Sequence, residues 1–317
     1  MKLRFKVLTA AGVLLGTAAA VYWLLPFCVP LPQLTPPEDA RVLDRHGALL
    51  GYVPGEDGYR CQPLGELPPQ LVRALLAAED KRFYSHGGVD ALALLRATWQ
   101  QLSGQGKSGA STISMQVAKM YSPPAPRNLR SKLREMLQAR RLEMTHSKEE
   151  LLRAYLNRAD FSNMCRGAET AARFYFGKGA GELNAPEAAL LVALVKSPTQ
   201  LNPVRHPRAA LKRRNLILLR MGEPVMAPLG VQPRSINAPA AAEGIPGQLT
   251  LDAGLQSRCA AIAREEVLRL QNRNVSQAAV VVADNRTGEV LVALPAACPE
   301  SPRGGAGAFC LKKYPKP

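Results

Sequence analysis

Three carboxylates stand among basic residues in the first half of this sequence. Glu79 and Asp80 end an apolar pattern of helical spacing, just before a glycine-containing loop. A carboxylate where a helix meets a cleft can act as a general base, although such a pair is also common at a solvated helix end. Glu135 follows Lys132 by three residues, so the two share one helical face. A carboxylate beside cations stays ionised, whether in a site or in an ordinary surface ion pair.

A second group of polar residues suits an anionic ligand. Gly109 precedes Ser111 and Thr112, which open an apolar helical pattern. Backbone N–H groups and hydroxyls at such a helix start can hold a phosphate. An ordinary N-cap has the same sequence signature. The pattern therefore predicts a helix start here and leaves the phosphate site as a hypothesis.

The charge of the chain indicates an anionic partner. The 317 residues carry 41 Lys and Arg against 25 Asp and Glu, a formal net charge of +16. Residues 60–221 hold 26 basic and 12 acidic side chains, so most of the excess lies there. Nucleic acid, a membrane surface or a phosphorylated substrate would each fit such a surface. The 47% hydrophobic content excludes a disordered tail, and six scattered cysteines favour neither a disulfide framework nor a zinc ribbon.

The N-terminus narrows the choice of partner. Lys2, Arg4 and Lys6 precede residues 7–29, which are uncharged and mostly apolar. At about 1.5 Å of rise per residue, a helix of this length crosses a hydrocarbon core of about 30 Å. The stretch is long for a cleavable signal peptide, although small residues at 18–20 leave cleavage open. The positive-inside rule then places the body of the chain outside the cytoplasm. A nucleic-acid partner is therefore not expected.

Periodicity and breaker residues predict how the elements follow one another. A strand is expected at residues 41–50 and helical patterns at 70–98, 111–120, 186–195 and 209–221. Residues 128–157 form one long helix or two that meet near 145–147, where Ser147 and Glu150 make a capping box. The proline-rich residues 223–247 are expected to be a linker, followed by a helix at 253–271 and a strand–turn–strand at 278–294.

The order and spacing of the polar residues resemble the peptidoglycan glycosyltransferases, the lysozyme-like domain of class A penicillin-binding proteins and of monofunctional transglycosylases. The resemblance covers about residues 60–220. The first two motifs stand as Glu79, Asp80, Phe83, His86, Gly88 and then Gly109, Ser111, Thr112, Gln116, Lys119. The later motifs are met by Lys132 and Glu135, by residues 148–157, and by residues 187–190 with Ser197, Pro198, Asn202 and Pro203.

The third motif departs from the family pattern at one position. Ser131 stands where the family has an arginine that contacts pyrophosphate. Arg130 or Arg134 is then a candidate replacement. Arg127 matches a further family arginine, eight residues after Lys119.

The resemblance implies the fold, the reaction and the site. The fold would be mainly α, a lysozyme-like helical domain behind a transmembrane helix, with a short α+β remnant at the C-terminus. The acceptor would be lipid II and the donor the growing glycan strand, joined by an inverting attack that forms a β-1,4 link. Glu79 would be the base and Glu135 a second carboxylate that organises the donor side. The predicted substrate-binding residues are Asp80, Phe83, His86, Ser111, Thr112, Gln116, Lys119, Arg127, Lys132 and Asn163.

These residues would have different tasks. Lys119, Arg127 and Lys132 would stabilise the departing pyrophosphate, because charge accumulates there in the transition state. Phe83 and His86 would hold the loop that carries Glu79. No cofactor is required by the pattern, and a divalent cation is left open.

The resemblance also implies a domain order and a location. Residues 1–30 would be a cytoplasmic stub and signal-anchor, 31–59 a connector, 60–222 the glycosyltransferase domain and 223–247 the linker. Residues 248–300 resemble the entry of a transpeptidase domain, and 301–317 form an irregular tail. No serine is followed by lysine three residues later, so transpeptidase activity is not expected and that domain looks truncated. The catalytic domain would face the periplasm on the bacterial inner membrane, with other cell-wall synthesis proteins as candidate partners.

Two further questions are left open by the sequence. Met115, Val117, Met120 and Tyr121 precede two prolines and form either a membrane-dipping segment beside the cleft, as the family resemblance implies, or the end of a core helix. The same fold would also suit a lytic glycosidase, and truncation would suit a non-catalytic membrane partner in a wall-synthesis complex. The anchor and the cations favour a pyrophosphate donor, and retention of both carboxylates argues against a non-catalytic role.

Overall fold

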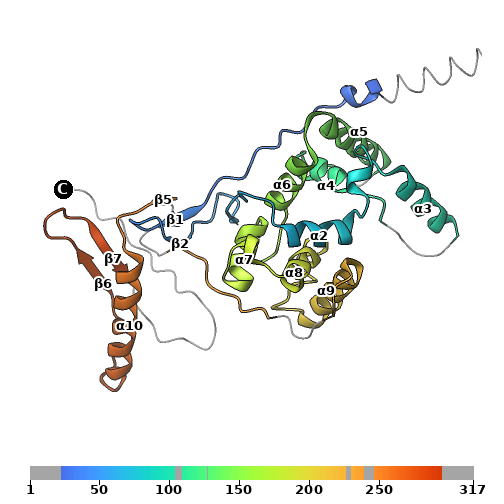
Figure 1. Cartoon of the computed structure of the whole chain (residues 1–317). Coiled ribbons are helices and arrows are strands. Elements are labelled where there is room, and N and C mark those ends of the chain that lie inside the picture. The colour runs from blue at the N-terminus through green and yellow to red at the C-terminus, as the bar shows by residue number, and fades with distance from the viewer. Residues whose placement is uncertain (1–22, 104–108, 127, 226–229, 239–245, 295–317) are drawn as a thin grey trace, which may run out of the picture. The chain divides into compact units, whose positions relative to one another are not determined.

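A computed structural model describes residues 23–103, 109–126, 128–225, 230–238 and 246–294, which are mainly helical, as expected (Figure 1). The described residues divide into two units. The larger unit comprises those up to Pro37 and Pro63–Pro233, and the smaller comprises Glu38–Gln62 and those from Arg234 onward. The strands at residues 41–52, within the expected connector, thus belong to the same unit as the C-terminal elements.

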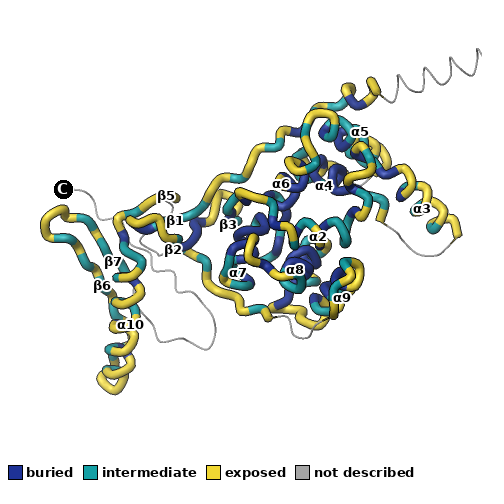
Figure 2. The backbone as a smooth tube through the Cα atoms, viewed as in Figure 1, coloured by how far each residue is buried: buried dark blue, intermediate teal, exposed yellow. Residues whose placement is uncertain are grey.

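The larger unit is a set of helices around a buried central helix. That helix is α8 (Ala185–Lys196), in which every residue from Ala188 to Leu194 is buried. It packs against α2 and α9, while α4 packs against α5 and α6 (Figure 2). The remaining elements of this unit are η1 (Leu25–Cys28), α2 (Pro69–Glu79), η2 (Phe83–Ser85), α3 (Ala91–Leu102), α4 (Ile113–Met120), α5 (Leu129–Thr145), α6 (Lys148–Arg158), β4 (Cys165–Arg166), α7 (Ala168–Phe176), η3 (Ala180–Glu182) and α9 (Pro207–Met221).

Side-chain caps set where several of these helices begin. Asp90 caps α3, and Thr112 caps α4 by accepting the N–H of Met115. The expected capping box of Ser147 and Glu150 is present at α6, which decides that residues 128–157 form two helices. The helical pattern at 70–98 is divided into two helices: α2 ends at Glu79, where the sequence predicts a helix end before a loop, and α3 begins at Ala91. The loop between them carries Asp80, which is buried and whose side chain contacts residues of other elements.

Gly88 closes that loop tightly against α5. Its φ is +95°, and a Cβ there would lie 2.7 Å from the carbonyl oxygen of Ala139 and from the backbone of Arg140. We expect Gly88→Ala to lower the free energy of unfolding by about 3 kcal/mol, because strain and a backbone clash add. Urea unfolding of the detergent-solubilised chain measures this. Gly65→Ala, where an added Cβ meets nothing within 4 Å, should stay near wild type; equal losses for both variants would contradict the expectation.

The smaller unit has short strands and one helix. β1 (Arg41–Leu43) pairs antiparallel with β2 (Leu49–Tyr52) and parallel with β5 (Gly247–Gln248). The single strand expected at 41–50 is wrong, because Asp44 accepts the N–H groups of His46 and Ala48 and turns the chain. The expected helix and hairpin are confirmed as α10 (Ala253–Arg269) and the antiparallel β6 (Val280–Ala283) and β7 (Val290–Leu294). The unit also contains β3 (Arg60–Cys61).

The expected membrane anchor falls mostly on residues 7–22, outside the described residues. Within the described part of the chain, none of the helices has both the length and the apolar character needed to span a bilayer.

Candidate active site

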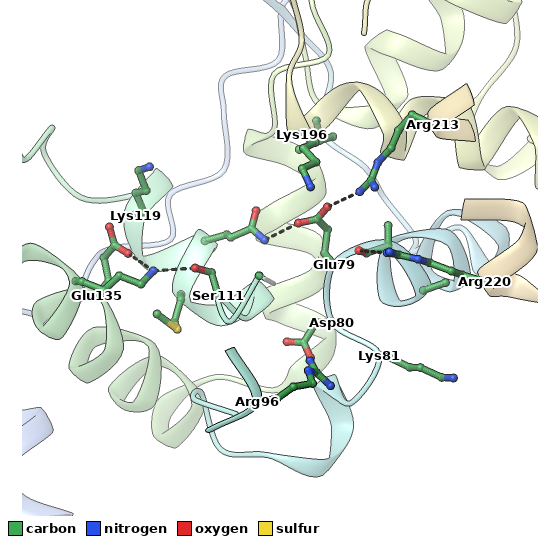
Figure 3. A pocket seen from close by; sticks show the side chains of 17 residues that line it. Glu79, Asp80, Lys81, Arg96, Ser111, Lys119, Glu135, Lys196, Arg213 and Arg220 are labelled. Carbon is green, nitrogen blue, oxygen red and sulfur yellow. Dashed lines mark hydrogen bonds and ion pairs between the residues drawn. The ribbon is translucent and has the colours of Figure 1, made fainter. Parts of the chain in front are cut away.

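A cavity of about 750 Å³ opens in the larger unit between α2, α4, α5, α8 and α9. Three of its lining residues are acidic and seven are basic, so the cavity favours an anionic ligand. Figure 3 shows Glu79, Lys196 and Arg213 grouped together, with Lys119 and Glu135 apart from them. The charged lining residues are Glu79, Asp80, Lys81, Arg96, Lys119, Lys132, Glu135, Lys196, Arg213 and Arg220.

Glu79 is the last residue of α2 and points into the cavity. Its Oε2 accepts a hydrogen bond of 3.0 Å from Nε2 of Gln116. Its Oε1 lies 3.7 Å from a guanidinium nitrogen of Arg213 on α9. The C-terminus of a helix disfavours a further negative charge, so these two contacts stabilise the carboxylate and fix its direction. Burial lowers the pKa of Arg213, an effect that the charge of Glu79 opposes.

Glu135 is a second glutamate of the cavity, and it lies beside a cation and a hydroxyl. Nζ of Lys132 lies 2.9 Å from Oε2 of Glu135 and 2.8 Å from Oγ of Ser111 (Figure 3). The contact to Ser111 joins the start of α4 to α5, whereas the pair with Glu135 lies within α5. Lys119, on the last turn of α4, is exposed and has no hydrogen-bond or ion-pair partner among the described residues. Its ammonium group is therefore available to an anion in the cavity.

Asp80 and Thr112 tie the start of α4 to the loop that follows Glu79. Asp80 accepts the backbone N–H of Ile113 at 3.1 Å and contacts Nε2 of His86 at 3.0 Å. Oγ1 of Thr112 donates to the carbonyl of Gly88 at 2.6 Å. Both side chains are buried, and of the two only Asp80 lines the cavity.

Phe83 and His86 lie in the same loop, and Lys148 of α6 contacts both. Nζ of Lys148 donates to the carbonyls of Phe83 and His86, at 2.5 and 2.8 Å, and lies 4.2 Å from the centre of the Phe83 ring. Phe83 is fully buried, and neither Phe83 nor His86 lines the cavity. Support of the loop that carries Glu79, the task that the sequence predicts for these two side chains, stays a prediction.

Other predicted residues lie elsewhere. Asn163 does not line the cavity: its Nδ2 donates to the hydroxyl of Tyr175 at 2.8 Å, and its Oδ1 accepts from Asn202. Arg127 lies outside the described residues. Arg130 and Arg134, the candidate replacements at the Ser131 departure, are exposed, and neither is among the residues that line the cavity.

The sequence leaves open whether the segment from Met115 to Tyr121 dips into the membrane or is the end of a core helix. Met115 and Val117 are buried, because α4 packs between α5 and α6. For these two residues the structure favours the core helix end. Large exposed apolar residues are found instead on α3.

Sequence reasoning missed the cations on the α8 and α9 side of the cavity. Lys196 ends α8, and Arg213 and Arg220 lie on α9. The spacing of seven residues between the two arginines puts them on one face of a helix, and this was the available signal. Nothing in the local pattern says that this face lies beside Glu79.

The part of the chain that the structure describes contains no group of three or more His, Cys, Asp or Glu residues that could hold a metal ion. The cavity is instead rich in ammonium and guanidinium groups, which can neutralise a phosphate by themselves.

Comparison with known proteins agrees with this arrangement. The family model described as Transglycosylase matches residues 47–222. Penicillin-binding protein 1A of Aquifex aeolicus is 37% identical over 222 residues, which are 66% of this chain and 30% of the relative. A putative transglycosylase of Cupriavidus necator is 40% identical over 161 residues, which are 51% of this chain and 70% of the relative.

A further relative is a penicillin-binding protein of the 1C type, the type that the motifs of this sequence resemble. Penicillin-binding protein 1C of Escherichia coli is 34% identical over 281 residues, which cover 81% of this chain and 36% of the relative. This chain thus spans about a third of the length of the penicillin-binding proteins named here.

Proposed function

From the premise that the chain belongs to the transglycosylase family, we propose that it is a peptidoglycan glycosyltransferase that polymerises lipid II into β-1,4-linked glycan strands and releases undecaprenyl pyrophosphate. The observation that carries this proposal is the position of Glu79. Its carboxylate is held by Gln116 and Arg213 at the wall of a cavity in which cations outnumber carboxylates by seven to three. A base and a site for a polyanionic leaving group therefore share one cavity.

In the proposed reaction Glu79 takes the proton from the 4-hydroxyl of the acceptor sugar. The freed oxygen attacks the anomeric carbon of the donor, and the bond to the pyrophosphate breaks with inversion. The negative charge moves onto the leaving group, where a fixed cation stabilises the transition state more than the ground state. Lys119 and Lys132 are the described cations that we assign to this task, with Arg127 as a predicted third. Glu135 would hold Lys132 in place.

The decisive experiment is polymerisation of lipid II by the purified full chain in detergent. Glycan strands together with free undecaprenyl pyrophosphate, both suppressed by the glycosyltransferase inhibitor moenomycin, are the expected result. Cleavage of preformed glycan without pyrophosphate release would instead identify a lytic glycosidase. Neither reaction, from a folded chain, would favour a non-catalytic partner in a wall-synthesis complex.

Membrane attachment is the second part of the proposal. Residues 7–29 would anchor the chain with the catalytic domain on the periplasmic side. A stripe on α3, made of Leu92, Leu95, Trp99 and Leu102, would contact the bilayer. These four side chains are 63% to 81% exposed, and their spacing of three, four and three residues places them on one helical face. Exposed apolar stripes of this kind suit a lipid surface.

We expect Trp99 to be quenched by brominated acyl chains when the full chain is reconstituted in vesicles. The chain has two tryptophans, so the Trp23→Phe variant reports Trp99 alone. As the matched control, a variant with both tryptophans changed to phenylalanine and Leu268→Trp places the probe at an exposed apolar site on α10. This probe should not be quenched. Equal quenching of the two probes, or none of Trp99, would contradict the α3 contact.

A further inference from the structure

A buried hydrogen-bond chain reaches Glu79 from the interior of the larger unit. The hydroxyl of Tyr155, on α6, donates to Oε1 of Gln116 at 3.2 Å. Nε2 of Gln116, on α4, donates to Oε2 of Glu79 at 3.0 Å. Tyr155 is fully buried and does not line the cavity. It therefore acts on Glu79 only through the glutamine amide.

The direction of this chain follows from the chemistry of its first member. Burial and the negative charge of Glu79 both raise the pKa of Tyr155, so its phenol keeps its proton. The described residues offer that hydroxyl a single hydrogen-bond partner, Gln116. A phenol that donates to Oε1 holds the carbonyl end of the amide, and the NH₂ end must then face the carboxylate.

The alternative orientation of the amide would damage the site. A rotation of Gln116 by half a turn would place Oε1 against Oε2 of Glu79, and two acceptors would then face each other. Without the hydroxyl of Tyr155, only the contact with Glu79 still disfavours this rotation. The phenol therefore supplies the second of the two contacts that favour the observed orientation of the amide.

We propose that Tyr155 is a positioning residue, which sets the Gln116 amide so that it donates to Glu79 and keeps the carboxylate aimed into the cavity. This inference rests on the proposed role of Glu79 as the base. Tyr155 lies on α6, a helix that contributes no residue to the cavity wall. The effect belongs to the chemical step, because neither the hydroxyl nor the amide carbonyl is placed to contact the cations that would bind pyrophosphate.

The test is a double-mutant cycle in the lipid II polymerisation assay, using Tyr155→Phe, Gln116→Ala and the double variant. Tyr155→Phe removes one hydroxyl and should lower kcat about 10-fold, the effect of one net hydrogen bond, with little change in KM. Gln116→Ala should lower kcat by as much or more. In the double variant the loss should equal that of Gln116→Ala alone, since Tyr155 acts through the amide.

Tyr52→Phe is the matched control for the loss of a buried hydroxyl. Tyr52 is 1% exposed and its hydroxyl also donates to a glutamine Oε1, that of Gln62, but neither residue lines the cavity. Both phenylalanine variants should lose similar stability in urea, and Tyr52→Phe should keep the wild-type kcat. A wild-type kcat for Tyr155→Phe, or losses that multiply in the double variant, would overturn the inference. Failure of the wild-type chain to polymerise lipid II would instead refute the proposed function.

Discussion

Replacing Glu79 with glutamine should abolish lipid II polymerisation, with kcat reduced at least about 1,000-fold. General base catalysis contributes about 100- to 10,000-fold, and a neutral amide cannot take the acceptor proton. The substitution keeps the size of the side chain. Its carbonyl oxygen can still accept from Gln116, which donates at 3.0 Å in the wild-type chain. The loss should therefore appear in kcat, while lipid II binding changes little.

The control for this variant is another carboxylate of the larger unit. Glu66 is exposed, has no hydrogen-bond or ion-pair partner among the described residues, and does not line the cavity. Glu66→Gln should polymerise lipid II at the wild-type rate. If Glu79→Gln still formed strands at that rate, the base would have to be a different group. Glu135 would be the next carboxylate to test, since it lines the same cavity.

Much of the site follows from short-range signals in the sequence. Thr112 and Ser147 are N-caps, and their helices begin where the sequence indicates. The carboxylates Glu79 and Glu135 are brought to one cavity, together with the amide of Gln116. Spacing within a helix determines which residues share a face, so motif residues on a single helix are easily placed.

Long-range packing accounts for what the sequence does not reveal. The face of α4 that carries Met115 is equally apolar whether it meets lipid or protein, and only its packing against neighbouring helices decides the outcome. The same applies to Arg213, since its role depends on α9 lying beside α2. Asp80 shows a third case. Its burial against His86 and the N–H of Ile113 depends on the position of α4, which the local sequence pattern does not give.

The departure at Ser131 makes the two lysines of the cavity more important. The N–H of Ser131 donates to the N-cap Asn128 at 2.8 Å, so this residue serves the start of α5. The exposed arginines beside it do not line the cavity. Among the described residues, the proposed stabilisation of the leaving group at this end would then depend on Lys119 and Lys132.

Lys132→Met should therefore lower kcat about 100-fold, because removal of one preformed charge contact in a transition state costs about that much or more. Lys132→Arg keeps the charge and should recover part of the rate, although its planar group cannot copy both the 2.9 Å contact to Glu135 and the 2.8 Å contact to Ser111. Lys119→Met should also lower kcat, without loss of stability, since Lys119 is exposed.

Lys178→Met separates the loss of a charge from the loss of an ion pair. Lys178 pairs with Glu187 at 2.7 Å, much as Lys132 pairs with Glu135, but it does not line the cavity. Breaking it should cost a similar small amount of stability and leave kcat unchanged. Equal kcat values for Lys132→Met and Lys178→Met would show that Lys132 is only a structural partner of Glu135. The expected difference of about 100-fold would instead assign its charge to the departing pyrophosphate, where the reaction deposits negative charge.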